Sequence, residues 1–334
     1  MKILAIETSC DETSVSIVED GTTELANIVL TQMSIHKEYG GVVPEIASRH
    51  HVQNITMLID ECLEKSNLKL TDLDAIGVTA GPGLIGALLV GVETAKGLAY
   101  SLNIPLIPVH HIAGHIYANN LVRRLEFPLL ALVVSGGHTE IILMENDYTF
   151  IKLGGTLDDA IGEAFDKVAR VLKLPYPGGP EIDKLSKLGT DSYELPTPMD
   201  DNSYNFSYSG LKSAVINLVT REISRKNEIR PNDLAKSFSE RATSILVKKV
   251  IKATKEYDIS NIIVAGGVAA NTLFRSKIKE ACTSNNITIS IPPVSYCTDN
   301  AAMIGAAAYY AYEKGIIADI TLNAKANKKL FKGE

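Results

Sequence analysis

Two histidines four residues apart carry the spacing in this sequence that most directly indicates chemistry. His111 and His115 follow a short apolar run, residues 104–109, and open a stretch that predicts a helix running to about Arg123. Residues four apart lie one above the other on a helix, so both imidazoles can point at one divalent metal ion. The chain has seven histidines, so a chance pair at this spacing remains the alternative. His36, His50 and His51 have no ligand-type residue at suitable spacing and are interpreted as solvated or locally bonded.

Two strand–turn–strand patterns surround polar turns. Residues 8–14 separate strand-like segments 2–6 and 15–19, and residues 135–139 separate segments 129–134 and 140–144. The repeat predicts two lobes of similar topology, each placing a loop over a shared cleft. Gly136 and Gly137 would let backbone approach a phosphate closely, although glycines that supply positive φ in a hairpin turn are an equal alternative.

Two further glycine turns follow buried-type strands. Residues 266–271 follow strand 261–265 and precede a helix, which is typical of a nucleotide site. Residues 81–86 match G-x-G-x-x-G, but the next strand ends in His110 and not in the acidic residue that a dinucleotide ribose requires. The helix that follows, 87–100, is apolar almost all round, so we interpret this second turn as structural.

Two aspartates lie at or near helices. Asp166 lies on the charged face of a predicted helix, 158–172, where charges are usually only solvated. Asp299 precedes an alanine-rich helix, 301–313, where capping the helix is the ordinary role of an aspartate.

Bulk properties narrow the class of protein. A chain of 334 residues can form two lobes, and a net charge of −6 means that a nucleic-acid substrate would need local basic patches or a partner protein. Four scattered cysteines without a C-x-x-C pair argue against disulfides and a zinc ribbon. The start of the chain lacks a signal-peptide pattern, and Glu93 and Lys96 interrupt the apolar stretch 84–104. We therefore expect a cytoplasmic protein with no membrane association.

Nine motifs together resemble one family along nearly the whole chain. They are residues 6–13, 81–91, 110–115, 134–139, 164–167, 177–180, 206–213, 266–271 and 298–302. In register over more than 290 residues, they resemble the bacterial TsaD branch of the universal tRNA threonylcarbamoyladenosine transferases, formerly described as glycoproteases.

The resemblance implies an α/β, actin-like and sugar-kinase-like (ASKHA) fold with two lobes around a central nucleotide cleft. We place the N-terminal lobe at residues 1–127, with helix 300–315 packing back on it. The C-terminal lobe is placed at residues 128–299 and includes an inserted loop near 189–207. Residues 320–334 are expected to form a flexible, lysine-rich tail.

The resemblance also implies the reaction and its participants. A threonylcarbamoyl group would move from threonylcarbamoyl-AMP to N6 of adenosine 37 in tRNAs that read codons beginning with A. The implied partners are tRNA, a TsaB-like paralogue of the same fold and a TsaE-like P-loop ATPase. His111, His115 and Asp299 would hold one divalent metal ion, Fe²⁺ or Zn²⁺. The implied adenylate-binding positions are Val133, Val134, Ser135, Gly136, Gly137, Asp166, Gly179, Asp183 and Asn271.

The chemistry agrees with these assignments. The donor carries a good leaving group, AMP, so positioning and polarisation of its carbonyl suffice, and a bound cation can polarise it. Asp11 and Glu12 on the first turn are candidates to accept the proton or contact the acceptor; solvated loop carboxylates are the alternative.

Four other functions are alternatives to this one. An ATP-dependent small-molecule kinase or a carbamoyltransferase of the same fold would not need the His–His–Asp set. A metalloprotease would carry H-E-x-x-H, whereas Ile112, Ala113 and Gly114 separate the two histidines. A nucleotide-regulated scaffold would carry out no chemistry.

Overall fold

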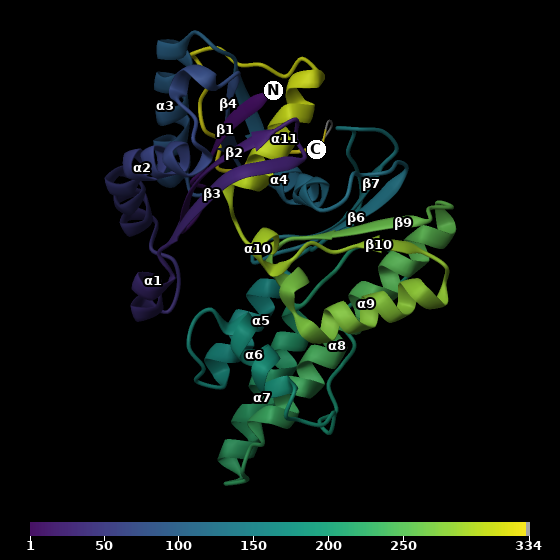
Figure 1. Cartoon of the computed structure of the whole chain (residues 1–334). Helices are drawn as coiled ribbons and strands as arrows, with labels where there is room; N and C mark the ends of the chain where they lie inside the picture. The colour runs from purple at the N-terminus through teal and green to yellow at the C-terminus, as the bar shows by residue number, and fades with distance from the viewer. Residues whose placement is uncertain (332–334) are drawn as a thin grey trace. The chain divides into compact units, whose positions relative to one another are not determined.

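The computed structural model describes residues 1–331 and divides into two compact units (Figure 1). Unit 1 comprises Met1–Glu126, Asn146–Phe150 and the chain from Ser295 onward. Unit 2 comprises Phe127–Glu145 and Ile151–Val294. Each unit is described by itself.

Unit 1 contains a five-stranded sheet in the order β3-β2-β1-β4-β5. β1 pairs antiparallel with β2 and parallel with β4, which pairs parallel with β5. The strands are β1 (Lys2–Glu7), β2 (Glu12–Glu19), β3 (Thr23–Thr31), β4 (Ala75–Gly81) and β5 (Leu106–His110). The helices are α1 (Met33–Tyr39), α2 (Pro44–Ser66), η1 (Leu70–Asp72), α3 (Ile85–Leu102), α4 (His111–Tyr117), η2 (Ala118–Leu121) and α11 (Ala301–Glu313), while α10 (Val294–Cys297) crosses the boundary between the units.

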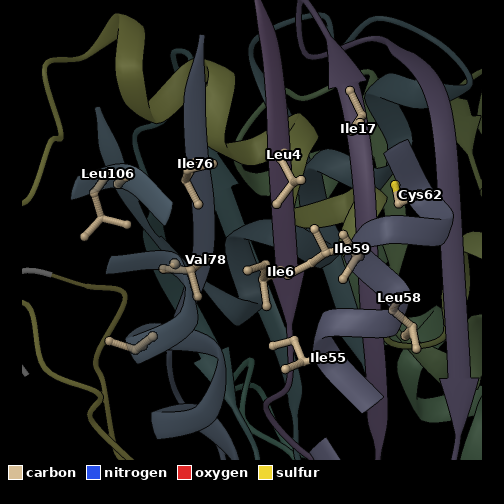
Figure 2. Close-up of a cluster of buried hydrophobic side chains, with 14 of the residues drawn as sticks. Leu4, Ile6, Ile17, Ile55, Leu58, Ile59, Cys62, Ile76, Val78 and Leu106 are labelled. Carbon is tan, nitrogen blue, oxygen red and sulfur yellow. The ribbon is translucent and has the colours of Figure 1, made fainter. Parts of the chain in front are cut away.

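One face of this sheet forms the main core with α2 and α3. Figure 2 shows Leu4 and Ile6 of β1 and Val78 of β4 together with Ile55 and Ile59 of α2. Because side chains alternate between the faces of a strand, Ile3 and Ala5 of β1 must point to the opposite face.

α11 and α4 cover that opposite face. Small residues bring α11 close to the strands: a Cβ on Gly305 would lie 2.6 Å from Cγ2 of Val18, and one on Gly77 would lie 2.9 Å from Cβ of Ala308. α11 therefore packs on the N-terminal strands from a position far along the chain.

Unit 2 repeats the same topology, with strand order β10-β9-β6-β7-β8. β6 pairs antiparallel with β7 and parallel with β9. The strands are β6 (Leu129–Val134), β7 (Thr139–Met144), β8 (Ile151–Gly155), β9 (Asn261–Ala265) and β10 (Thr288–Ser290). The helices are α5 (Ile161–Val171), α6 (Gly178–Ser186), α7 (Ser209–Ser224), α8 (Pro231–Glu256), η3 (Gly267–Ala270) and α9 (Thr272–Ser284). The predicted repeat of two similar α/β sheets is confirmed.

Four features differ from the sequence-based expectations. The helix that begins at His111 ends at Tyr117, not near Arg123, and continues as the 3-10 turn η2. The segment Asn146–Phe150 belongs to unit 1, although it lies inside the expected C-terminal lobe, and the chain returns to unit 1 at Ser295 rather than after residue 299. The edge strands β3 and β8 were not predicted.

The C-terminal segment, expected to be flexible, makes specific hydrogen bonds over its described part, residues 320–331. The Lys325 amide donates to the carbonyl of Ala80 (3.0 Å), and the Gly83 amide donates to the carbonyl of Ala326 (3.1 Å). Nε2 of His110 lies 2.9 Å from the carbonyl oxygen of Lys328. Residues 332–334 of the expected tail, including Lys332, lie outside the described residues.

α3 is long and apolar enough, by length and composition alone, to cross a membrane. Its residues Leu88, Val92, Ala95 and Ala99 pack into the core cluster of unit 1. Core helices of soluble proteins meet the same criterion, so this helix is weak support for a membrane span.

Candidate functional site

Three parallel strands of unit 1 deliver three polar side chains to one face at their carboxyl ends. Val78 lies beside Ile6, and Val109 lies beside Thr79. The period-2 alternation therefore places Glu7 and Thr79 on the α4–α11 face of the sheet, and His111 follows two residues after Val109. All three side chains are buried.

His111, His115 and Asp299 form a compact cluster within unit 1. Their ligand-type atoms all lie within 4.8 Å of one another. Oδ1 of Asp299 lies 3.2 Å from Nε2 of His115 and 3.6 Å from Nε2 of His111. The two imidazole rings are nearly perpendicular, with centroids 4.6 Å apart. Two histidines four residues apart on α4 and an aspartate just before the distant helix α11 thus come together at one point.

The cluster fits a divalent cation. A tetrahedral site with bonds of about 2.0–2.2 Å separates its donor atoms by roughly 3.3–3.6 Å, close to the two distances to Asp299. His115 is 1% exposed, and neither of its ring nitrogens has a hydrogen bond to any residue that the structure describes. Buried imidazole nitrogens usually have partners, and a bound cation would supply one to Nε2, the ring nitrogen that lies nearest Asp299.

The electrostatics of the cluster also favour a positive charge. Burial lowers the pKa of His111, but Asp299 and Glu7 outweigh burial and raise the pKa to about 9. Burial raises the pKa of Glu7, and the adjacent His111 reverses this, so the pKa falls below its usual value. Burial, Asp299 and Asp11 together raise the pKa of Glu12 to about 9. A cation at this point would relieve the repulsion between these carboxylates.

Asp299 does not have the ordinary role that the sequence suggested for it. The N-cap of α11 is Asn300, whose Oδ1 accepts from the amide of Met303 at 3.0 Å. The expectation that Asp299 caps the helix is therefore wrong by one position. The carboxylate of Asp299 faces the two histidines instead.

Of the three histidines expected to be solvated or locally bonded, His36 and His51 are buried. His51 Nδ1 lies 2.7 Å from Oγ1 of Thr13, and its Nε2 lies 3.0 Å from the carbonyl of Cys10. His36 Nε2 lies 3.2 Å from Oε1 of Gln32. Both histidines are therefore locally bonded, as one of the two expected alternatives states. Neither belongs to the metal-type cluster.

Asp11 and Glu12 lie at the turn between β1 and β2, and both are half-buried. Glu12 begins β2 opposite Thr31, whose hydroxyl donates to Oε1 of Glu12 at 3.3 Å. Asp299 is one of the charges that raise the pKa of Glu12. The role of the two carboxylates in catalysis stays a prediction.

In unit 2, Val133 and Val134 are the buried end of β6, and Ser135, Gly136 and Gly137 form the turn into β7. Neither glycine has a positive φ. A Cβ built on either one would meet nothing within 4 Å in the described chain. Neither the backbone conformation nor packing therefore requires glycine here, and the alternative that these glycines supply positive φ is wrong.

Two neighbouring glycines, in contrast, are required by packing. A Cβ on Gly162 would lie 2.6 Å from the carbonyl oxygen of Ser135. A Cβ on Gly266, which has φ +92°, would lie 2.5 Å from the carbonyl oxygen of Val134. The starts of α5 and η3 therefore touch the Ser135 turn, so these predicted segments are brought together.

The remaining predicted positions are Asp166 in α5, Gly179 and Asp183 in α6, and Asn271 at the N-cap of α9. Oδ1 of Asp166 accepts from the amide of Gly178 at 2.7 Å, and Gly179 has open space around its Cβ position among the described residues. Asp183 accepts from the amide and the hydroxyl of Thr272 at 3.1 and 2.9 Å. Asn271 caps α9 through the amide of Phe274. Three of these side chains therefore also organise the local backbone.

Glu7 was not among the predicted site residues. It is 1% exposed and lies against His111, with Nδ1 of His111 3.2 Å from its Oε2. The signal that could have found it is the alternation Ile3, Ala5, Glu7, which continues an inward-facing row with a carboxylate.

Comparison with solved structures identifies the fold class of this protein. The structure matches component A of (R)-2-hydroxyglutaryl-CoA dehydratase from Acidaminococcus fermentans with a TM-score of 0.54 and 16% identity, over 94% of this chain and 98% of that chain. It matches T. kodakarensis HypF with a TM-score of 0.62 and 14% identity, over 96% of this chain and 49% of that chain. Together with the duplicated sheet, these matches define an α/β protein of the actin-like and sugar-kinase-like fold, here with a histidine–carboxylate cluster.

The chain belongs to the TsaD family of tRNA N6-adenosine threonylcarbamoyltransferases, whose model matches residues 23–306. It is 56% identical over 322 residues to the enzyme of that name from Staphylococcus saprophyticus, covering 96% of this chain and 94% of the relative. It is 53% identical over 332 residues to the Bacillus subtilis enzyme of the same name, covering 99% and 96%. The family predicted from the nine motifs is confirmed.

Proposed function

We propose that this protein transfers a threonylcarbamoyl group from threonylcarbamoyl-AMP to N6 of adenosine 37 in tRNAs that read codons beginning with A. The observation that carries the proposal is the family match along nearly the whole chain, which gives transfer to N6 of a tRNA adenosine. The identity of the donor and the position of the adenosine in the tRNA go beyond the family match and are part of the proposal. A kinase or a protease would be expected to match another family.

We propose that His111, His115 and Asp299 hold one divalent metal ion, Fe²⁺ or Zn²⁺. Two neutral imidazoles and one carboxylate suit either ion and leave coordination positions for other ligands. When bound, the ion would supply Lewis-acid polarisation of the donor carbonyl. The short donor-atom distances and the orphaned ring of His115 support this assignment.

We propose that the adenylate part of the donor binds on unit 2, at Val133–Gly137, Asp166, Gly179, Asp183 and Asn271. The open positions beside Gly136, Gly137 and Gly179 support this, since backbone without side chains lets a phosphate or base approach closely. Asp166 and Asp183 each keep lone pairs beyond their bonds within the chain, and these suit ribose hydroxyls.

The reaction forms one bond and breaks one. N6 of the adenosine attacks the carbamoyl carbon, a C–N bond forms, and the C–O bond to the phosphate breaks to release AMP. The amine loses a proton during this exchange. We propose Asp11 or Glu12 as its acceptor, because both carboxylates lie at the half-buried turn between β1 and β2. Glu12 can accept a proton once a bound cation relieves the repulsion from Asp299 that raises its pKa.

The partners in this proposal are tRNA, a TsaB-like paralogue of the same fold and a TsaE-like P-loop ATPase, acting in the cytoplasm. An acidic chain with a net charge of −6 is poorly suited to hold tRNA without help. This supports an assembly in which partner proteins supply part of the tRNA-binding surface.

The direct test supplies purified protein and its partners with synthetic threonylcarbamoyl-AMP and unmodified tRNA. Mass spectrometry of the digested tRNA should detect threonylcarbamoyladenosine at position 37, and complete absence of the product would refute the proposal. His111→Ala should abolish both product and bound metal, measured by elemental analysis, while the matched variant His50→Ala keeps both. Asp166→Ala should weaken nucleotide binding in calorimetry, and unchanged affinity would remove Asp166 from the site.

A further inference from the structure

Glu7 is a buried carboxylate at the end of the central strand β1, directly behind the first histidine of the metal-type cluster. Its two oxygens contact three polar groups. The amide of Ser9 donates to Oε1 at 2.5 Å, and the hydroxyl of Thr79 donates to Oε2 at 2.6 Å. Nδ1 of His111 lies 3.2 Å from the same Oε2. The carboxylate is therefore held from three elements at once.

These contacts determine which nitrogen of His111 carries the proton. Oγ of Ser9 also lies 3.2 Å from Nδ1, so two tautomers can be considered. If the Ser9 hydroxyl donated to Nδ1, the lone pair of that nitrogen would face a carboxylate oxygen, which can only accept. If Nδ1 carries the proton, it donates to Glu7 and the contact is favourable. The second tautomer is therefore the one that Glu7 selects.

The selected tautomer directs the other nitrogen toward the cluster. Nε2 of His111 lies 3.6 Å from Oδ1 of Asp299, on the opposite side of the ring from Glu7. With the proton on Nδ1, Nε2 has its lone pair free to bind a cation. A carboxylate behind a ligating histidine also raises the basicity of the ligand.

The loop after β4 holds this arrangement in place. The amide of Leu84 donates to the carbonyl of Ser9 at 2.8 Å, and a Cβ on Gly83 would lie 2.6 Å from that same oxygen. This loop is the glycine motif at residues 81–86 that sequence analysis interpreted as structural. It braces Ser9, whose amide in turn binds Glu7.

We propose that Glu7 is a positioning residue that fixes the tautomer and ring orientation of His111 so that Nε2 faces the metal ion. This inference rests on the proposed metal site at His111, His115 and Asp299. Glu7 does not contact the ion or the substrate; it acts through His111. In Glu7→Gln, an NH2 group replaces one of the two carboxylate oxygens. In one orientation this donor faces the amide of Ser9, and in the other it faces His111 and Thr79.

The experiment measures the affinity of the purified full-length chain for Zn²⁺ and Co²⁺ alone. We expect Glu7→Gln to weaken metal binding by about 10- to 100-fold and to change the visible spectrum of bound Co²⁺. Ser9→Ala, which removes the competing hydroxyl, should change the affinity by less than about threefold, because the Glu7 contact remains. Ser16→Ala, which removes a buried hydrogen bond to Ala26 elsewhere in the sheet, should leave affinity and spectrum unchanged.

The outcomes separate this inference from the metal site itself. If the wild-type chain binds neither ion, the metal site and the inference both fail. If the wild-type chain binds metal and a folded Glu7→Gln binds it equally well, or if Ser9→Ala costs as much as Glu7→Gln, only the role of Glu7 is refuted. If Glu7→Gln does not fold, the wild-type chain loaded with ¹¹³Cd decides: nuclear magnetic resonance coupling to Nε2 of His111 supports the inference, and coupling to Nδ1 overturns it.

Discussion

Oδ1 of Asp299 lies 3.2 Å from Nε2 of His115, while the neighbouring Asn300 caps the helix that follows. Two adjacent residues thus have separate tasks, one at the histidine cluster and one at the backbone of α11. This separation allows the two tasks to be tested independently.

We expect Asp299→Ala to lower the affinity for Zn²⁺ at least tenfold, because the cluster loses its only carboxylate among the three predicted ligands. Asn300→Ala should instead cost about 1 kcal/mol of folding stability through loss of the cap and keep metal affinity within a few-fold. Competition with a chromophoric chelator measures the affinity, and urea unfolding measures the stability. The same loss of affinity in both variants would contradict the assignment.

The glycines around the Ser135 turn should respond oppositely to alanine. Gly136→Ala adds a methyl group into open space and should leave the protein folded, with stability unchanged or raised by about 0.4–1 kcal/mol, while nucleotide affinity falls. Gly162→Ala would place its Cβ 2.6 Å from a carbonyl oxygen and should destabilise the fold. Thermal unfolding and calorimetry with AMP compare the two. Normal nucleotide affinity in Gly136→Ala would remove this turn from the adenylate site.

The carboxylate of Asp159 should make a pH-dependent contribution to the folding stability of unit 2. Burial raises the pKa of Asp159, but hydrogen bonds from Lys167 (2.7 Å) and Lys212 (2.6 Å) outweigh burial and lower it overall. A carboxyl whose pKa is lower in the folded state stabilises the fold above its unfolded pKa of about 3.9 and loses this contribution as the pH falls through the folded value.

Asp159→Asn should therefore be less stable at pH 7, by about 1.5–3 kcal/mol for charged hydrogen bonds, and the difference from wild type should shrink as the pH falls below about 4. Urea unfolding at several pH values tests this. Asp60→Asn, at an exposed position of α2, is the matched control. A constant difference across the pH range would refute the ionic origin.

The acidic chain alone should bind tRNA weakly. It carries 33 lysines and arginines against 39 aspartates and glutamates, so long-range attraction to phosphates is not favourable overall. Fluorescence anisotropy with labelled tRNA at 50 and 200 mM salt measures this, with and without the partner proteins. Tight binding by the chain alone, with a steep dependence on salt, would contradict the prediction.

Local patterns were sufficient for the central strands and for the histidine pair. Alternating or continuous apolar runs indicated β1, β4, β5 and β6, and the spacing of four indicated that His111 and His115 share a helix face. The edge strands β3 and β8 were missed because they are partly exposed and polar, so tertiary pairing rather than residue pattern defines them.

The contact between Glu7 and His111 could not be read from local pattern. It depends on the strand order β1-β4-β5, which brings the ends of three separate segments to one face. A glutamate at the end of a strand is equally typical of a solvated turn. Asp299 was chosen by resemblance, since no periodicity links it to α4. Its placement depends on α11 packing back on unit 1.

Because unit 1 is discontinuous in sequence, its parts are synthesised at different times. Residues 1–126 leave the ribosome first, unit 2 follows as a nearly continuous block, and Asp299 and α11 come after it. Until then, the face of the sheet that carries Ile3, Ala5 and Val109 has no α11 to cover it, which makes the nascent chain prone to aggregation. The proposed metal site therefore has all three of its residues only after unit 2 has been synthesised.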